Sequence, residues 1–372
     1  MLVIEGAPPN PMASAGERAC LDLIETLLER GDRVGFAAIG RAGPGDDRLT
    51  DQLRDLGVQI ADSTATGIPG IADALDEFDP EVAITHRPGP ALAAISALTD
   101  RPEVVRVYWG HDIHAWRLAA QNRVLAEQAD HRERLTVLAE RRDWDAYDVC
   151  VYPTAREADF VNAEGGCAEA IPYYRLTEQD LPPAAPHHGR RGALLVGGSA
   201  HLPNRDAVEF TIAEVLPLLG DFPLTVVGQW HPDLVEALQR PNVTFTGMVD
   251  EQRLRELHQE HVCLLAPLRF GAGTRRKLVS AMGFGLPVVT TSEGVRGLLV
   301  TDATADDGVL IADTPAGIAA HVLRLAHDET EWRRLSAVAT SRIRSVYGAD
   351  AYAASIERVL QTGSARRDGR ST

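Results

Sequence analysis

Short apolar segments alternate with amphipathic helical segments along most of the chain, and this alternation restricts the fold more than any other feature. Strands that alternate with helices form parallel sheets whose two faces are covered by the helices. In the first half the expected strands are Leu2–Glu5, Arg33–Ile39, Val58–Ile60, Glu81–Thr85, Glu103–Trp109 and Asp148–Tyr152. In the second half they are Ala193–Val196, Leu224–Val227, Val243–Thr246, Val262–Ala266, Pro287–Thr290 and Val309–Ile311. The sequence therefore predicts an α/β protein with two doubly wound parallel sheets.

A proline-rich stretch over residues 181–191 separates the two series, and its composition is typical of a linker. A length of 372 residues also suggests two domains, each large enough for its own core. We expect an N-terminal domain over 1–175, a linker over 176–189 and a C-terminal domain over 190–347. The polar tail 363–372 is expected to be disordered. Two doubly wound domains imply a ligand cleft between them, at the carboxyl ends of the strands.

The net charge of −16 argues against a broad nucleic-acid or anionic-membrane surface, because both require extended positive potential. The four cysteines show no metal-type spacing, so no metal is expected. No signal-like segment opens the chain, and no run reaches the roughly 18 apolar residues of a transmembrane helix. These features favour a cytoplasmic protein. Scarce lysine beside abundant alanine, arginine and aspartate suggests a bacterial source with a GC-rich genome.

The only lysine of the chain, Lys277, ends the basic stretch Gly-Ala-Gly-Thr-Arg-Arg-Lys that begins at Gly271; the other 36 of the 37 basic residues are arginines. Glycines lead here into an expected helix, Arg275–Phe284. Cations in the first turn of a helix are unfavourable unless an anion pairs with them, while glycines and free backbone N–H groups suit a phosphate. We therefore expect a phosphate site in which an ammonium and a guanidinium are not neutralised by protein carboxylates. A solvated basic turn is the alternative.

Three segments of the second half carry a likeness to a known family: Leu195–Ser199 with Leu202–Ala207, Val243–Val249, and above all the continuous run Ala266–Thr290. Three shorter ones in the first half are looser: Pro11–Arg18, Val107–Asp112 and Tyr152–Glu157. The chain resembles GT-B glycosyltransferases, specifically the retaining, family-4-type (group 1) enzymes. The resemblance implies two Rossmann-like domains facing across a cleft, with a closing helix, 348–362, that returns to the first domain.

The same resemblance implies a retaining, hexosyltransferase-type enzyme that moves a sugar from a nucleotide-diphosphate sugar to an acceptor, with neither a cofactor nor a metal. No Asp-x-Asp motif occurs in a suitable loop, which agrees with metal independence. A small soluble acceptor is preferred over a lipid-linked one, because no basic amphipathic helix suited to a membrane surface is evident. No nucleic-acid partner and no transmembrane segment are expected.

The matched motifs assign expected roles to individual residues. Arg275 and Lys277 would stabilise the leaving diphosphate, whereas Arg276 falls at a variable, solvent-facing position. His111 would lie near the reactive face of the sugar; an ordinary loop histidine held by Asp112 is the alternative. The expected donor-binding residues are Gly16, Gly197, Gly198, Gly247, Met248, Val249, Gly271, Ala272, Gly273, Thr274, Ser280 and Glu293. Weaker acceptor-side candidates are His86, Arg87, Asp112 and His114.

Two departures from the family pattern leave other readings open. Relatives usually carry glutamates where this chain has Ala272 and Ser280, so either Glu293 replaces a ribose contact or the donor is an unusual deoxyribonucleotide sugar. Relatives also often carry an Arg and Lys pair after the first strand of the second half, which this chain lacks. A nucleotide-sugar epimerase or phosphorylase on the same fold, or a catalytically weak partner subunit, are therefore alternatives.

Overall fold

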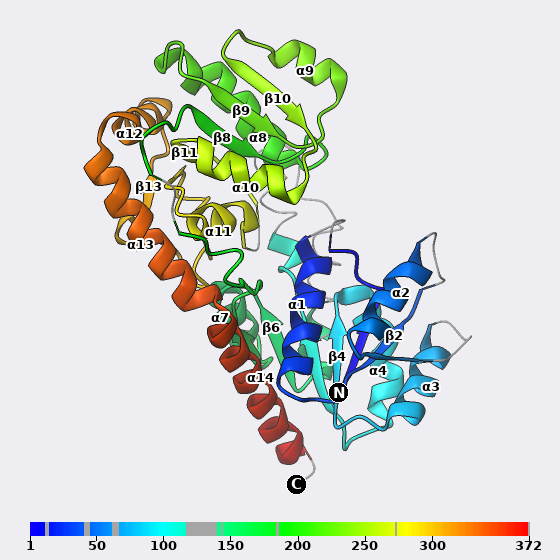
Figure 1. Cartoon of the computed structure of the whole chain (residues 1–372). Coiled ribbons are helices and arrows are strands. Elements are labelled where there is room, and N and C mark those ends of the chain that lie inside the picture. Colours follow the sequence, from blue (N-terminus) through cyan, green and yellow to red (C-terminus); the bar gives the residue numbers. More distant parts are fainter. Residues whose placement is uncertain are drawn as a thin grey trace. The chain divides into compact units, whose positions relative to one another are not determined.

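The computed structural model describes residues 1–11, 15–40, 45–61, 67–116, 140–142, 144–183, 186–271 and 274–370. These residues divide into two compact units (Figure 1). Unit 1 comprises the described residues up to Arg175 together with Ala349–Arg370, and unit 2 comprises those of Leu176–Gly348. No helix among the described residues is long and apolar enough to cross a membrane.

Unit 1 is built on a seven-stranded sheet in the order β3-β2-β1-β4-β5-β6-β7, in which every pair of neighbouring strands is parallel. The order reverses between β1 and β4, and ligands of doubly wound folds bind at such a switch point. Its strands are β1 (Leu2–Glu5), β2 (Gly35–Ala38), β3 (Gln59–Ile60), β4 (Val82–His86), β5 (Val105–Trp109), β6 (Val149–Tyr152) and β7 (Ala168–Ala170). Strand β7 was not predicted, because Ala-Glu-Ala has weak strand propensity and is held by its pairing with β6.

Helices flank this sheet along the chain, as the alternating pattern requires. They are α1 (Ala15–Glu29), α2 (Asp46–Asp55), α3 (Ile68–Phe78), α4 (Pro88–Thr99), α7 (Ala155–Ala163) and α14 (Ala349–Arg370). The long helical region expected from His114 to Arg142 lies largely outside the described residues.

The C-terminal helix α14 extends to Arg370, so the prediction of a disordered tail over 363–372 is wrong for 363–370. Gly363 lies against the sheet of unit 1, where an added Cβ would be 2.8 Å from Val105 Cγ1 and 3.1 Å from Val149 Cγ1. Further along the helix, Arg367 Nη1 donates to the carbonyl of Glu103 at 3.1 Å. Although the segment is polar in composition, one face of the helix packs against the sheet of unit 1. Composition alone does not reveal such a face.

Replacing Gly363 with leucine is expected to destabilise unit 1 by about 1–3 kcal/mol, because the new side chain overpacks a well-filled contact. Gly369→Leu on the same helix is the matched control, since an added Cβ there meets nothing within 4 Å. Thermal unfolding of the two variants measures the difference. Equal melting temperatures would contradict the packing of α14 on β5 and β6.

Unit 2 is built on a six-stranded, fully parallel sheet in the order β10-β9-β8-β11-β12-β13. Its strands are β8 (Ala193–Val196), β9 (Leu224–Val227), β10 (Val243–Gly247), β11 (Cys263–Ala266), β12 (Val288–Thr290) and β13 (Val309–Ile311). Its helices are α8 (Leu202–Phe210), α9 (Pro232–Leu238), α10 (Glu251–Glu260), α11 (Arg276–Gly283), α12 (Pro315–His327) and α13 (Glu329–Tyr347). The predicted fold class, two doubly wound parallel sheets, is confirmed.

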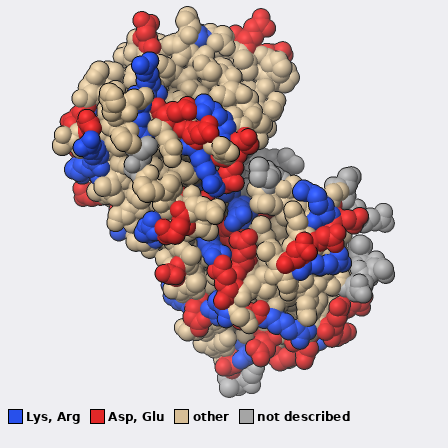
Figure 2. All heavy atoms as spheres, in the orientation of Figure 1, with Lys and Arg blue, Asp and Glu red and all other residues tan. Residues whose placement is uncertain are grey.

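Acidic and basic side chains are interspersed on the face of the molecule drawn in Figure 2, and this face carries no broad basic surface. Exposed arginines of the described residues also pair with carboxylates, as between Arg253 and Glu260, whose Nη1 and Oε1 atoms are 2.6 Å apart.

Candidate functional site

Lys277 lies in the first turn of α11, directly after the glycine-containing loop that follows β11. Arg275 precedes the helix with a non-helical backbone, and the first turn contains no acidic residue. The Lys277 side chain is part-buried, and its Nζ donates a hydrogen bond to Asn204 Oδ1 at 2.5 Å. Burial lowers the pKa of Lys277 to about 7, and the adjacent positive charge of Arg275 acts in the same direction. The described contacts thus give the ammonium a neutral partner instead of a carboxylate.

Arg275 differs from Lys277, because its guanidinium is buried and engaged by the protein. Its Nη1 donates to the carbonyl of Arg296 at 2.9 Å, and its Nη2 pairs with Glu293 Oε1 at 3.1 Å. The other Glu293 oxygen, Oε2, lies 2.6 Å from Arg296 Nη1. The expectation of two cations without carboxylate partners is therefore wrong for Arg275, because the turn after β12 places the carboxylate of Glu293 beside the Arg275 guanidinium. Glu293, the candidate ribose ligand, has both oxygens paired with guanidinium groups.

The loops that end β8 and β9 come too close to each other for side chains. An added Cβ at Gly228 would lie 2.7 Å from the carbonyl carbon of Gly197, and one at Gly198 would lie 2.9 Å from Gln229 O. At Gly197 it would lie 2.4 Å from the amide of Asn204. Gly197 and Gly228 have φ values of 149° and 133°, which only glycine adopts readily. The predicted donor-binding glycines Gly197 and Gly198 therefore expose bare backbone beside the residue that holds Lys277.

The other predicted donor-binding residues of unit 2 are dispersed over neighbouring segments. Gly271 has a φ of 148° and lies beside Arg275, with 3.6 Å from an added Cβ to Nη2. Ser280 lies about one helical turn after Lys277 on α11 and is part-buried. Met248 is 68% exposed, immediately after the positive-φ glycine that ends β10. The remaining candidates are Thr274, Gly247 and Val249, which are described, and Ala272 and Gly273, which lie outside the described residues.

In unit 1, three residues predicted separately come together: Gly16 at the start of α1, His86 at the end of β4, and His111 after β5. His111 Nε2 lies 3.1 Å from His86 Nδ1. An added Cβ at Gly16 would lie only 2.3 Å from His111 Cε1 and 2.6 Å from its Nδ1. The ring of Tyr173 packs edge-on against His111 from another side, with 4.9 Å between ring centroids. The imidazole is therefore confined by a glycine, a histidine and a tyrosine.

Glu5, at the end of β1, lies beneath this group and was not identified as a site residue from the sequence. Its Oε2 lies 3.3 Å from His86 Nδ1 and 3.5 Å from Arg87 Nε. Burial lowers the pKa of His86, which favours its neutral form. Arg87 has a φ of 71°, an uncommon value for a residue other than glycine, at the start of α4. A charged residue that ends a buried strand was the available signal for Glu5.

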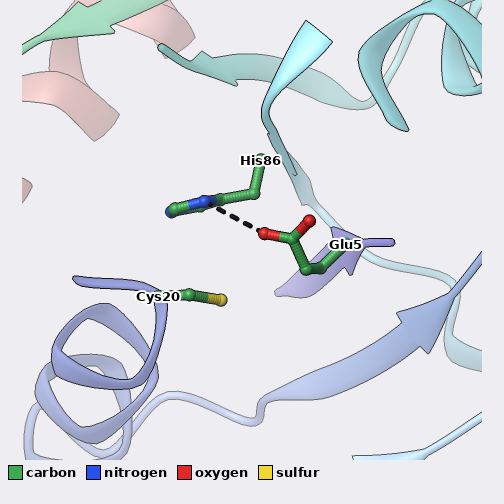
Figure 3. Close-up of side chains that lie close together, drawn as sticks. All are labelled: Glu5, Cys20 and His86. Atoms are coloured by element: carbon green, nitrogen blue, oxygen red, sulfur yellow. Dashed lines mark ion pairs between the residues drawn. The ribbon is translucent and has the colours of Figure 1, made fainter. Parts of the chain in front are cut away.

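Glu5 and His86 also form, with Cys20 of α1, a buried group of three different potential metal ligands whose nearest ligand atoms lie within 4.8 Å of one another (Figure 3). A cation there would have to compete with existing contacts. The Glu5 carboxylate already neighbours the Arg87 guanidinium, and His86 Nδ1 already neighbours His111. Burial raises the pKa of the Cys20 thiol well above its usual value, which disfavours a thiolate ligand. We therefore treat this group as support beneath His111.

Asp112 and His114 form a separate contact on the same loop. His114 Nε2 lies 3.1 Å from Asp112 Oδ1, and the backbone N–H of His114 donates to Glu140 Oε1 at 2.7 Å. Asp112 is buried. The loop after β5 is thus fixed by carboxylates, and the contacts described here place Asp112 beside His114 and His86 beside His111.

Comparison with known proteins agrees with this architecture. Residues 191–328 match the family model described as "Glycosyl transferases group 1". No curated protein matches the chain by sequence. Among solved structures, sucrose-phosphate synthase from Thermosynechococcus elongatus is similar, with a TM-score of 0.71, 14% identity, and coverage of 97% of this chain and 98% of that one.

Two further structures show the same similarity over nearly the whole length. HepE from Anabaena, solved in complex with UDP and glucose, has a TM-score of 0.70 and 12% identity, covering 97% of this chain and 98% of its own. TarM has a TM-score of 0.73 and 9% identity, with the same two coverages of 97% and 98%. Residues 191–328 are thus similar to the group 1 glycosyltransferases, and over nearly its whole length the chain has the GT-B fold of these solved structures.

Proposed function

We propose that this protein is a retaining glycosyltransferase that moves a sugar from a nucleotide-diphosphate sugar to an acceptor hydroxyl. The observation that supports this most is Lys277: a part-buried ammonium with a neutral partner, placed at a helix N-terminus beside glycine loops. A protein that needed only stability would not keep such a cation, because burying a charge without an opposite charge is costly. A diphosphate supplies the missing negative charge.

In the proposed reaction the hard step is departure of the nucleoside diphosphate, whose negative charge increases as the sugar–oxygen bond breaks. Preorganised donors aimed at that charge stabilise the transition state without a protein nucleophile. Lys277 would supply the principal positive charge, and the backbone at Gly197, Gly198 and Gly271 would approach the phosphates closely. Arg275 would act partly by holding the turn of Glu293 and Arg296 next to Lys277, and partly by its own charge.

The unit 1 group around His111 would serve the sugar and the acceptor. Burial favours the neutral form of His86, and its Nδ1, 3.1 Å from His111 Nε2, fixes one edge of the His111 imidazole. The ring also lies close against Gly16, and in the proposed role this positioned imidazole would contact a hydroxyl of the sugar or acceptor. An imidazole can donate or accept a hydrogen bond, which suits contact with such a hydroxyl.

For the donor, a uridine nucleotide is the first choice to test, because the similar protein HepE was solved with UDP, with UDP and glucose, and with UDP-glucose. We further propose that transfer is of the hexosyltransferase type, needs neither metal nor cofactor, takes place in the cytoplasm, and uses a small soluble acceptor. Both Glu293 oxygens are paired with arginines, so the ribose of the donor would be contacted by Ser280 or by the backbone instead. A deoxyribonucleotide sugar is therefore also a donor to be tested.

The test is turnover with UDP-, ADP-, GDP- and dTDP-glucose, each with and without a panel of small hydroxylated acceptors and with EDTA. The proposal expects release of the nucleoside diphosphate that depends on acceptor and is insensitive to EDTA, and an α-linked product from an α-linked donor. Conversion of a donor without acceptor would instead indicate an epimerase or hydrolase. Failure of every donor to bind would favour a partner subunit without catalytic activity.

A further inference from the structure

Asn204 connects two parts of the candidate diphosphate site that come from different strand ends. It lies in the first turn of α8, which follows β8 and the Gly197–Gly198 loop. Lys277 lies in the first turn of α11, which follows β11. Strands β8 and β11 are neighbours in the sheet. One side chain at Asn204 therefore reaches both the Gly197–Gly198 loop and the lysine.

The two ends of the Asn204 amide make different hydrogen bonds. Oδ1 accepts from Lys277 Nζ at 2.5 Å, and Nδ2 donates to the carbonyl of Gly198 at 3.3 Å. An ammonium has donors only, so it must meet the oxygen of the amide, and this leaves the NH₂ group for a carbonyl. The close approach to Gly197 limits the freedom of the amide further. Its orientation is thus set by chemistry at both ends.

We propose that Asn204 is a positioning residue of the donor site: a neutral acceptor that aims the Lys277 ammonium at the donor diphosphate and holds the Gly197–Gly198 loop beside it. The inference rests on the proposed function. Neutrality is the essential property. A carboxylate at this position would neutralise the ammonium and repel the diphosphate, and an apolar residue would leave a part-buried ammonium without an acceptor.

The charges around Lys277 agree with this role. Arg275 is the charged group that lowers the lysine pKa, and its guanidinium is paired with Glu293. On α8, Asp206 lies two residues after Asn204, and its carboxylate is engaged by Arg269, with 2.9 Å between Oδ2 and Arg269 Nε. Glu293 and Asp206 are therefore each paired with an arginine, and the amide of Asn204 provides the acceptor for the ammonium.

Because the chain has a single lysine, lysine labelled with ¹³C at Cε gives one NMR signal that reports on this ammonium alone. Titration without any donor should give a midpoint near the value of about 7 set by burial and Arg275. Asn204→Ala should lower the midpoint, since it removes a hydrogen bond to the charged form, and Asn204→Asp should raise it. A wild-type midpoint near that of an ordinary lysine, or midpoints that move in neither variant, would overturn the proposal.

Donor affinity, measured by calorimetry at pH 6.5 with the nucleotide sugar that binds best, provides the second readout. Both Asn204 variants should bind it at least ~10-fold more weakly, the typical scale for a hydrogen bond to a charged group. Asn242→Ala is the matched control: it too removes two hydrogen bonds of an asparagine amide, here from Nδ2 to the carbonyls of Gly220 and Phe222 at 3.1 and 3.0 Å, without touching Lys277. The control should change neither readout.

The two readouts separate the inference from the function on which it rests. Shifted midpoints with weakened donor binding support both. If the wild-type protein binds no nucleotide sugar while the midpoints shift as expected, the proposed function fails and the Asn204–Lys277 contact stands. If donors bind equally well to wild type and both variants, the positioning role fails and the proposed function stands. If circular dichroism shows that both variants are unfolded, the wild-type titration is still informative. A Lys277 midpoint near 10.5 overturns the proposal, and a midpoint near 7 supports it.

Discussion

Replacing Lys277 with methionine is expected to reduce turnover about 100- to 1000-fold, the usual cost of removing one preorganised group that stabilises developing negative charge. Methionine keeps most of the apolar stem and removes the charge, so the fold should survive. The folded-state pKa of about 7 is below the usual lysine value of 10.5, so the folded protein binds fewer protons than the unfolded chain between these values. Lysine therefore costs stability most below pH 7, and the inactive variant should be as stable as the wild type there, or more stable.

The pH dependence of donor binding gives the same prediction a second readout. Lys277 loses its proton as pH rises through about 7, so affinity for UDP-glucose should fall above that pH, by up to about tenfold per pH unit. UDP-glucose is the suitable probe, because its diphosphate is esterified at both ends and lacks the phosphomonoester ionisation near pH 6. Lys277→Arg should flatten the profile, since a guanidinium does not titrate in this range.

Arg276→Met is the matched control for this prediction, because Arg276 is the adjacent cation of the same turn and its side chain is exposed. It should retain turnover and the pH profile of the wild type. Loss of only a few-fold in Lys277→Met, or an equal loss in Arg276→Met, would contradict the assignment of the ammonium to the leaving group. The protein would then be better described as a GT-B partner subunit.

Features that depend on local periodicity could be predicted from the sequence, whereas contacts between residues far apart in the chain could not. The alternation of strands and helices is local, and both parallel sheets follow from it. The pairing of Arg275 with Glu293 joins residues 18 positions apart through the turn after β12, so the basic stretch alone could not show that Arg275, unlike Lys277, is paired with a carboxylate. Likewise, the segment containing Asn204 could be recognised as a loop and helix, but its reach to Lys277, 73 positions away, requires the strand order.

The same distinction applies in unit 1. Each candidate residue there was predicted from its place at a strand or helix end, and the residues that it contacts were not predicted. Gly16 follows β1 and His111 follows β5, and these two strands are separated by β4 alone, so the two residues can be placed together only once the order β1-β4-β5 is known. Glu5 was missed because a carboxylate at a strand end resembles an ordinary solvated residue, while the structure buries it beside His86 and Arg87. A sequence pattern thus locates candidate groups, and the topology decides which of them can act together.

Gly16→Ala is expected to lower turnover about 100-fold or more, the scale of a catalytic group displaced by about 1 Å. The added methyl carbon would lie 2.3 Å from His111 Cε1, so the imidazole must move and its contact with His86 must break. Stability should change little, because alanine favours the helix α1 by about 1 kcal/mol relative to glycine. Gly89→Ala in the first turn of α4 is the control, as its Cβ meets nothing within 4 Å. If His111 is the target, Gly16→Ala should add no further loss to His111→Ala. Fully additive losses would show that the glycine acts by another route, such as backbone contact with the donor.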